Sequence, residues 1–405
     1  MGLARSGVAA ARALLSLGER VVAVDAGAPD VPAGLDAHVR SDGLAELEHA
    51  RAVVKSPGVP REAPVIVAAR ARGIPVLGEL ELGWRLLPHE FVAVTGTNGK
   101  TTTVQLLGHI HREAGLAVAV AGNVGDAVSG LVGSLGRDGV VVCETSSFQL
   151  EDALEFAPEG AVLLNVRPDH LDRHGTFDDY LGAKLRVFAR QGSDDVAVAP
   201  AGLEVGGCAR RVSFGPGGDL DDRAGCLWWD DEPLIAHDEI RLRGAHNRLN
   251  AAAAAAIALA RGVERHAVRA ALRTFGGVEH RLEEVASIAG VLYVNDSKAT
   301  NVASTLVALA SFEAPVHLIL GGVGKGQDFT ALRGRAHRAY LIGEAAGQLQ
   351  REVGGERCGA LEAAVARARE DAREGEVVLL SPACASFDQF ADYEARGRAF
   401  KALVG

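Results

Sequence analysis

The stretch FVAVTGTNGKTTT, from Phe91 to Thr103, decides how the central part of the chain folds. Its apolar first half predicts a buried β-strand, and the polar half predicts a glycine-rich turn that opens a helix. Gly96 and Gly99 permit positive φ angles and close backbone approach, so the amides of the turn can converge on phosphate. Lys100 can reach the outer phosphates, and the hydroxyl of Thr101 can ligate Mg²⁺. The stretch therefore predicts an ATP site.

The spacing of this stretch differs from the common phosphate loop G-x-x-x-x-G-K-[ST], because Val94 stands at the position of the first glycine. The alternative interpretation is an ordinary strand-to-helix turn that binds nothing. A strand, the sequence Gly-Thr-Asn-Gly-Lys-Thr and a helix in direct succession favour the ATP site.

Composition limits the class of protein. With 405 residues the chain is too long for one ordinary core, so we expect two or three domains. A net charge of −10 disfavours nucleic-acid binding, which needs a basic face. The five cysteines form no C-x-x-C pair, which indicates reduced cytoplasmic thiols and no zinc site. The alanine tract 251–256 is too short to cross a bilayer, and we expect no membrane association.

Lysine is rare in this chain. Lysine and arginine together number 42, but only six are lysines: Lys55, Lys100, Lys184, Lys298, Lys325 and Lys401. Arginine serves wherever a generic positive charge is sufficient, so a lysine that remains is more often needed for its ammonium group or its amine. Four of the six lie in the motifs described here.

Residues 1–88 alternate short apolar runs with helical stretches. The runs 21–24, 53–54 and 74–77 predict strands, and the turn from Gly2 to Gly7 opens a helix. An acid, Asp25, follows that turn by about twenty residues, as in dinucleotide-binding proteins. However, Ala4 occupies the second glycine position of G-x-G-x-x-G, where the backbone should approach a pyrophosphate. We therefore favour another nucleotide over NAD.

The same turn raises a question about the first sheet. A phosphate turn normally follows a buried strand, which aims the turn and supports the helix behind it. Only Met1 precedes the turn here. We expect either that the first sheet lacks a strand, or that the true start lies upstream of Met1.

Polar side chains follow two further strands between residues 89 and 276. The run 140–142 predicts a strand that ends at Glu144, where a carboxylate could bind Mg²⁺. The run 161–165 predicts another, and the loop after it carries His170. A helix over 178–190 carries Lys184, and a second helix over 251–260 follows Asn250. Each residue taken alone also has a simpler interpretation. Glu144 could be a surface acid, His170 a solvated histidine and Lys184 an exposed helical lysine.

Residues 277–405 repeat the α/β pattern. We expect strands over 291–294, 316–320, 338–342 and 377–380, with ligand loops at one edge of a parallel sheet. The glycine-rich loop that carries Lys325 lacks the serine or threonine of a phosphate loop. A carboxylate substrate is therefore a better candidate for it than a second ATP, and a plain turn is the alternative.

Together, these motifs resemble the Mur ligase family over nearly the whole chain. Three groups are shared widely in that family: GTNGKTT (96–102), the acid of CETSS (143–147) and H-N-x-x-N (246–250). Six more resemble most closely the branch that adds D-glutamate: SSFQLE (146–151), NVRPDHLDRH (165–174), AKLRVF (183–188), NDSKATN (295–301), GGVGKGQDF (321–329) and SPACASFDQF (381–390). No Asp-Asn-Pro-Arg sequence occurs in the last third, which argues against the branch that adds meso-diaminopimelate.

The resemblance implies an α/β fold with three domains. These are a Rossmann-like nucleotide domain over 1–88, a central P-loop ATPase-type domain over 89–276 and a C-terminal Rossmann-like domain over 277–405. It also implies the reaction. ATP phosphorylates the carboxylate of UDP-N-acetylmuramoyl-L-alanine, and the amine of D-glutamate attacks the acyl phosphate. We expect a cytoplasmic monomer of peptidoglycan precursor synthesis, whose domains close about Pro88 and Gly276-Gly277.

The resemblance also assigns residues. The ATP contacts would be Gly96, Thr97, Asn98, Gly99, Lys100, Thr101, Thr102, Asn250, Arg281 and Asp296. The Mg²⁺ ligands would be Thr101, Glu144, His170 and Lys184. The UDP contacts would be Ser6, Asp25, Ser56 and Gly58, and the muramoyl-alanine contacts would be Asn123 and His170. The D-glutamate contacts would be Thr300, Lys325, Ser386 and Tyr393.

Three of these residues, Lys100, His170 and Lys184, would be catalytic. We expect Lys184 to be carbamylated, because an ammonium would repel Mg²⁺ whereas a carbamate offers it oxygen ligands. Two positions depart from the family pattern. Gly27 stands where some relatives have a basic residue near the uracil, and Tyr393 replaces a phenylalanine.

Three alternative functions remain. One is a related ligase that adds a different amino acid or extends folate, although a folate enzyme would not need the first domain. Another is a nucleotide sensor that has lost catalysis, which the presence of Glu144, His170 and Lys184 disfavours. The last is a dehydrogenase, disfavoured by Ala4 and by the nucleotide site at residue 96.

Overall fold

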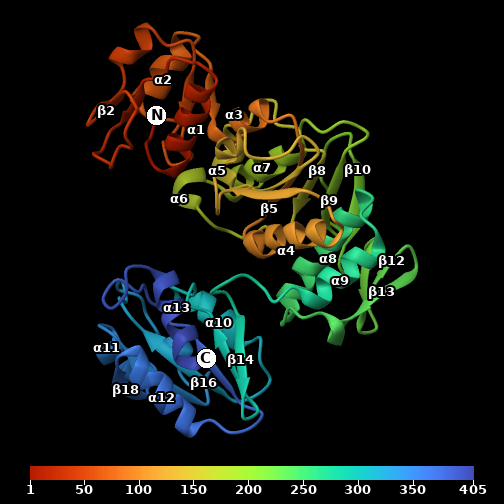
Figure 1. Ribbon diagram of the computed structural model, residues 1–405, viewed down its shortest axis with the longest axis vertical. Coiled ribbons are helices and arrows are strands. Elements are labelled where there is room, and N and C mark those ends of the chain that lie inside the picture. Colours follow the sequence, from red (N-terminus) through yellow and green to blue (C-terminus); the bar gives the residue numbers. More distant parts are fainter. The chain divides into compact units, whose positions relative to one another are not determined.

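The computed structural model describes residues 1–405 as two compact α/β units (Figure 1). Unit 1 comprises residues 1–240 and 246–274, and unit 2 comprises residues 241–245 and 275–405. The expected α/β class is confirmed, with large sheets that are mainly parallel. The domain boundaries at residues 88 and 276 stay predictions.

A nine-stranded sheet forms the core of unit 1, in the order β13-β12-β11-β10-β9-β8-β5-β7-β6. Its strands are β5 (Glu90–Thr95), β6 (Val118–Gly122), β7 (Val140–Glu144), β8 (Gly160–Leu163), β9 (Val196–Pro200), β10 (Arg210–Phe214), β11 (Leu220–Arg223), β12 (Cys226–Trp229) and β13 (Glu232–Ala236). The pairs from β6 to β11 are parallel, so their carboxyl ends share one edge. The pairs β11–β12 and β12–β13 are antiparallel.

Helices cover both faces of this sheet (Figure 1). The helices of this region are α4 (Lys100–Glu113), α5 (Ser147–Glu151), α6 (Leu171–His174), α7 (Phe177–Leu185), α8 (Ala245–Ala260) and α9 (Arg265–Thr274), of which α6 lies to the side of the sheet. Every residue from Ala251 to Ala258 in α8 is at most 1% exposed, because small side chains allow the helix to lie close to the sheet. Phe91 and Ala93 of β5 pack into the apolar core on the face that also includes Leu80, Phe156 and Val187.

The first 88 residues contain two separate two-stranded parallel sheets. One pairs β1 (Ala23–Asp25) with β2 (Ala37–Val39), and the other pairs β3 (Val53–Lys55) with β4 (Val76–Gly78). The helices here are α1 (Arg5–Ser16), α2 (Pro64–Ala71) and α3 (Glu79–Leu86).

Met1 and Gly2 lie between these two sheets. The amino group of Met1 donates to the carbonyl of Val54 (2.7 Å), and the amide of Gly2 donates to the carbonyl of Val24 (2.8 Å). The amide of Ser56 donates to the carbonyl of Met1 (3.0 Å). No strand joins β1 to β3, which agrees with the expectation that the first sheet lacks one.

Buried charged side chains connect this region to the rest of unit 1. Lys55 is completely buried and pairs with Asp152, after α5. Glu81 is also completely buried, and its carboxylate accepts hydrogen bonds from the amides of Leu154 (2.9 Å) and Phe156 (3.1 Å). Because a buried charge is costly without partners, these contacts fix how α3 and β3 pack. They also explain one of the lysines that lies outside the motifs.

A six-stranded sheet forms the core of unit 2, in the order β14-β15-β19-β16-β17-β18. Its strands are β14 (Glu283–Ile288), β15 (Val291–Asn295), β16 (Val316–Gly321), β17 (Arg338–Ile342), β18 (Glu356–Gly359) and β19 (Val377–Leu380). Only β14 is antiparallel to its neighbour. The helices α10 (Val302–Leu309), α11 (Ala346–Glu352), α12 (Leu361–Asp371) and α13 (Tyr393–Val404) complete two apolar cores.

Some predicted element bounds are wrong. The helix expected over 178–190 ends as α7 at Leu185 and continues as a short 3₁₀ turn, Arg186–Phe188. It begins earlier because the side chain of Thr176 accepts from the amide of Asp179. The helix expected from residue 251 begins at Ala245, and the strand expected over 21–24 is Ala23–Asp25. None of the helices has the length and apolarity that a membrane crossing requires.

Candidate active site

The glycine-rich turn lies between β5 and α4, as predicted. Gly96 and Gly99 have φ angles of 151° and 88°, which side-chain-bearing residues rarely adopt. The Nζ of Lys100 donates to the carbonyls of Gly96 and Thr97, at 2.9 Å each. The ammonium group of Lys100 therefore lies on the concave side of the turn, where the phosphates of a nucleotide would come close to it.

Asn165 holds this turn from the end of β8. Its Oδ1 accepts from the amide of Asn98, its Nδ2 donates to the carbonyl of Asn98, and its own carbonyl accepts from the amide of Thr97, all at 3.0 Å. Asn165 lies in the motif NVRPDHLDRH, but this role was not predicted. The signal was present, since a polar residue ended a strand beside β5.

Asn250 contacts the turn from α8. A Cβ atom at Gly99 would lie 2.2 Å from the Oδ1 of Asn250, so only glycine fits there. Asn250 is 6% exposed, and its Nδ2 donates to Asn247 (3.2 Å). The structure thus brings this predicted ATP residue to the turn from about 150 residues further along the chain.

The carboxylate of Glu144, at the end of β7, lies beside the hydroxyl of Thr101 next to the turn. The Oε2 of Glu144 accepts from the hydroxyl of Thr101, and its Oε1 accepts from the Nδ2 of Asn123, both at 2.9 Å. Glu144 is 1% exposed. A buried carboxylate whose hydrogen bonds come from neutral groups, with a hydroxyl next to it, fits the oxygen ligands that Mg²⁺ prefers.

Lys184 reaches the same place from α7. It is 2% exposed, and its Nζ donates to the carbonyl of Gly96 (2.8 Å) and lies 4.6 Å from the centre of the Tyr180 ring. Burial, and then the charge of Lys100, lower the pKa of Lys184 to about 7. Near neutral pH, a substantial share of this amine is therefore uncharged.

His170 lies at the margin of this group. It is exposed and has a φ angle of 52°. Its Nε2 is 3.6 Å from Asp169, and its ring centre is 4.9 Å from that of Phe148 and 6.5 Å from that of Tyr180. No hydrogen bond or ion pair joins His170 to Glu144 or Lys184.

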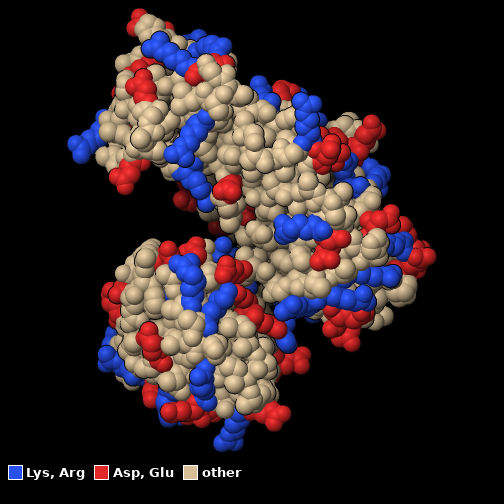
Figure 2. Space-filling model, in the orientation of Figure 1, with Lys and Arg blue, Asp and Glu red and all other residues tan.

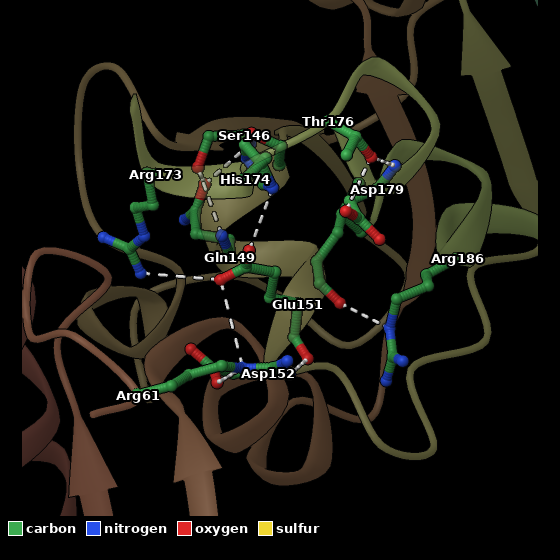
Figure 3. Close-up of polar contacts among 12 residues, drawn as sticks. Arg61, Ser146, Gln149, Glu151, Asp152, Arg173, His174, Thr176, Asp179 and Arg186 are labelled. Atoms are coloured by element: carbon green, nitrogen blue, oxygen red, sulfur yellow. Dashed lines mark hydrogen bonds and ion pairs between the residues drawn. The ribbon is translucent and has the colours of Figure 1, made fainter. Parts of the chain in front are cut away.

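A polar network fixes the loop that carries His170 (Figure 3). His174 is buried, with its Nδ1 3.1 Å from Glu151 and its Nε2 3.0 Å from Ser147. Burial lowers the pKa of His174, which favours the neutral ring. Arg173 lies 4.1 Å from the centre of the Phe148 ring and donates to the carbonyl of Pro57 (3.2 Å). Sequence analysis noted these residues without predicting the network.

The predicted UDP residues lie around the turn Gly2–Gly7. Asp25 accepts from the amides of Leu3 (2.6 Å) and Gly27 (2.7 Å), and the hydroxyl of Ser56 donates to the carbonyl of Gly2 (2.7 Å). Ser6 is half-buried in α1, and Gly58 is exposed. A groove beside this turn is lined by Ala4, Arg5, Arg12, Asp30 and Asp126, among others. Its two arginines were not predicted from the sequence.

In unit 2, Asp296 follows β15. It is 5% exposed and accepts from the hydroxyl of Ser381 (2.7 Å) and the amide of Leu282 (3.2 Å). Burial outweighs these hydrogen bonds and the nearby charge of Arg281, and raises the pKa of Asp296 to about 7.

The loops after β16 and β19 lie against each other. Cβ atoms at Gly321 and Gly322 would lie 1.9 and 2.1 Å from the carbonyl oxygens of Ile342 and Ala385, so neither glycine can be replaced without movement. Lys325 is exposed with a φ angle of 51°, whereas Ser386 is 2% exposed. The remaining predicted glutamate residues are both half-buried: Thr300 before α10 and Tyr393 at the start of α13.

Arg396, in α13, connects the loops after β15, β16 and β19 by hydrogen bonds to their carbonyl groups. Although 1% exposed, its guanidinium donates to the carbonyls of Ser297 (2.9 Å), Cys384 (3.0 Å) and Gly321 (3.3 Å). Burial lowers the pKa of Arg396 to about 10, so the group stays charged at neutral pH. Sequence analysis missed it, because an arginine within a helix carries no distinguishing pattern.

In the view of Figure 2, basic and acidic side chains are interspersed. The net charge of the whole chain is −10.

This fold and this phosphate-loop site define an ATP-binding α/β protein. The family models of the Mur ligase middle domain and of the Mur ligase glutamate ligase domain match residues 94–211 and 280–384. The UDP-N-acetylmuramoylalanine–D-glutamate ligase of Pelotomaculum thermopropionicum is 42% identical over 100% of this chain and 96% of its own length. The chain belongs to the Mur ligase family.

Solved structures of more distant relatives share the fold. The UDP-N-acetylmuramate–alanine ligase of Thermotoga maritima aligns over 98% of this chain and 96% of its own, with a TM-score of 0.60 and 20% identity. The MurF ligase of the same organism, solved in complex with ADP, aligns over 88% of this chain and 95% of its own, with a TM-score of 0.58 and 17% identity.

Proposed function

We propose that this chain is an ATP-dependent ligase that joins D-glutamate to UDP-N-acetylmuramoyl-L-alanine in peptidoglycan precursor synthesis. The observation that carries the proposal is the convergence of Lys100, Thr101, Glu144 and Lys184 around the turn at Gly96. The D-glutamate ligases it resembles along its whole length give the substrate class. The nearest alternative within the family is addition of a different amino acid.

The chemistry requires charge neutralisation and positioning more than covalent help from the protein. An oxygen of the alanyl carboxylate attacks the γ-phosphorus of ATP, which gives an acyl phosphate and ADP. The amine of D-glutamate then attacks the acyl carbon, and the carbon–oxygen bond to phosphate breaks as the amide forms. Lys100 stabilises the charge on the transferring phosphoryl oxygens.

A magnesium ion would supply further neutralisation of phosphate charge. Thr101, Glu144 and a carbamylated Lys184 would hold it, with His170 contributing from its loop. The buried carboxylate of Glu144 and its neutral partners support this assignment. His170 contacts Asp169 and two aromatic rings, so its loop would have to bring it to the ion.

The substrates divide among the regions of the chain. We assign UDP to the groove beside α1, with Ser6, Asp25, Ser56 and Gly58, and the muramoyl-alanine to Asn123 and His170. Asn250, Arg281 and Asp296 would contact the nucleoside and phosphates of ATP. Thr300, Lys325, Ser386 and Tyr393 would contact D-glutamate. Cytoplasmic location and a monomeric state complete the proposal.

The test is phosphate release by the purified chain with ATP, Mg²⁺ and UDP-N-acetylmuramoyl-L-alanine. D-glutamate, L-glutamate, L-alanine and meso-diaminopimelate are compared as acceptors. We expect release with D-glutamate alone. Equal release with meso-diaminopimelate would overturn the substrate assignment, and no release with any of the four would overturn the ligase function.

A further inference from the structure

Two histidines and a glutamate meet at the amino edge of the sheet in unit 2. His317 is the second residue of β16, His337 directly precedes β17, and Glu376 directly precedes β19. These three strands are adjacent and parallel, so their amino ends share one edge. The loops of Lys325 and Ser386 follow the carboxyl ends of β16 and β19, at the opposite edge. One ligand atom from each of the three residues lies within 4.8 Å of the others.

The hydrogen bonds of His317 fix which nitrogen carries its proton. Asp371 pairs with the guanidinium groups of Arg338 and Arg367, so its carboxylate is ionised and can only accept. The hydroxyl of Tyr340, 3.0 Å from Asp371, must therefore donate to it. The same hydroxyl oxygen lies 2.8 Å from the Nδ1 of His317 and must accept from that nitrogen.

The other nitrogen of His317 then faces a second acceptor. Its Nε2 lies 2.9 Å from the Oε2 of Glu376, which also accepts from the amide of Arg373 (2.9 Å). With the proton of the neutral ring fixed on Nδ1, two lone pairs meet at this point unless a cation lies between them. That cation is either an additional proton or a metal ion.

The arrangement matches the way proteins present histidine to a metal. A ligating imidazole usually donates its remaining N–H to an outer partner that fixes its orientation, as Tyr340 does here. His317 is 1% exposed, whereas His337 is exposed, which leaves one side open to an entering ion. Ligand atoms of tetrahedral zinc lie about 3.4 Å apart, from bond lengths of about 2.0–2.2 Å. The set is therefore completed if His337 turns towards the ion and the Nε2 of His317 and the Oε2 of Glu376, now 2.9 Å apart, separate slightly.

We propose that His317, His337 and Glu376 bind one Zn²⁺ ion, with water in the fourth position. Two imidazoles and a carboxylate select zinc over Mg²⁺, which prefers oxygen ligands alone. Binding would connect the three adjacent strands, so the ion stabilises unit 2. This site is separate from the residues assigned to the ligase reaction.

The test is titration of the full chain with Co²⁺ as a spectroscopic probe, followed by competition with Zn²⁺. We expect one tight site with the visible absorption of tetrahedral nitrogen and oxygen ligation. Binding by the free cysteines would instead give thiolate-to-cobalt charge-transfer bands. Those bands, or no binding, would overturn the proposal.

His337→Ala should weaken this binding by at least 10-fold and leave ligase activity unchanged. The matched control is His266→Ala, an exposed histidine of α9, which should bind as the parent does. Tyr340→Phe removes the outer partner and should weaken binding by about 10–100-fold. Equal affinity in the parent, His337→Ala and His266→Ala proteins would contradict the proposal, whatever the effect of Tyr340→Phe.

Discussion

The two large sheets of this chain carry the loops proposed to bind ligands at the carboxyl ends of their parallel strands, and they hold those loops differently. In unit 1, Lys100 and Lys184 both donate to the carbonyl of Gly96, so the groups that close the turn are also the groups proposed for chemistry. In unit 2, Arg396 ties the loops from beneath, and Lys325 remains exposed above them.

This difference indicates that the two edges have different roles. The edge in unit 1 concentrates buried charge, with Glu144 and Lys184 at most 2% exposed, where electrostatic effects are strongest. The edge in unit 2 offers an exposed lysine on a pre-shaped loop, which suits recognition of an incoming carboxylate. Changes in unit 1 should therefore affect turnover, and changes in unit 2 should affect selection of the amino acid.

The largest effect should come from Lys100→Ala. Removal of one group that stabilises transition-state charge costs on the order of 2.7–4 kcal/mol, or about 10²–10³-fold in kcat. Circular dichroism should show an unchanged fold, because the hydrogen bonds that Lys100 donates to the carbonyls of Gly96 and Thr97 lie within the turn. Phosphate release near the parental rate would refute its assigned role.

Lys184→Ala should be the next most damaging change and should respond to chemical rescue. A short carboxylic acid such as formate can enter the space left by the side chain and restore part of the oxygen ligation of a carbamate. Intact mass measured under CO₂ should show the carbamate on the parent and none on the variant. A free amine in the active parent enzyme would exclude carbamylation.

The pH dependence of turnover follows from the same lysine. Carbamate forms from the neutral amine and CO₂ with loss of one proton, so it is favoured above the pKa of about 7 and lost below it. Activity should fall as the pH drops through about 7, and added bicarbonate should move this fall to lower pH. An acidic limb that does not move with bicarbonate would contradict the carbamate.

The lowered pKa of Lys184 should also make the free energy of unfolding depend on pH. The pKa of Lys184 falls from 10.5 to about 7 on folding, so its burial destabilises the fold fully below pH 7. This cost decreases as the pH rises from 7 towards 10.5. In Lys184→Met, the rise in unfolding free energy over that interval should be smaller than in the parent, as measured by urea titration at each pH.

The smallest effect on turnover should come from Lys325→Ala. Loss of an exposed charge that binds a carboxylate should raise the KM for D-glutamate about tenfold, equivalent to about 1.4 kcal/mol, and leave kcat within a few-fold. The KM for ATP should not change. A drop in kcat as large as that of Lys100→Ala would contradict the proposal that unit 1 determines turnover and unit 2 determines selection of the amino acid.

Local patterns in the sequence predicted the turn after β5 and the strands on which the site is built. Apolar runs and glycines specify these elements over a few residues, so no distant partner is needed to recognise them. The phosphate-loop lysine and the acid at the end of β7 followed from the same reasoning. Lys184 required resemblance to the family, because a lone helical lysine has no local signature.

Contacts between distant residues could not be predicted in this way. Asn165 lies 67 positions from Asn98, Lys55 lies 97 from Asp152, and Arg396 lies 99 from Ser297. Their roles depend on which strands are neighbours in a sheet, and the order of the strands cannot be predicted from a single sequence. The antiparallel hairpins β11–β13 were also missed, because their strands are only four or five residues long and show no clear alternation.

The most direct test of the proposed reaction follows one oxygen atom. UDP-N-acetylmuramoyl-L-alanine labelled with ¹⁸O in the alanyl carboxylate is incubated with ATP, Mg²⁺, D-glutamate and the purified chain, and the released phosphate is analysed by mass spectrometry. Because the carboxylate oxygen that attacks phosphorus leaves with it when the amide forms, we predict one ¹⁸O in each released phosphate. Unlabelled phosphate released together with amide product would contradict the acyl-phosphate account.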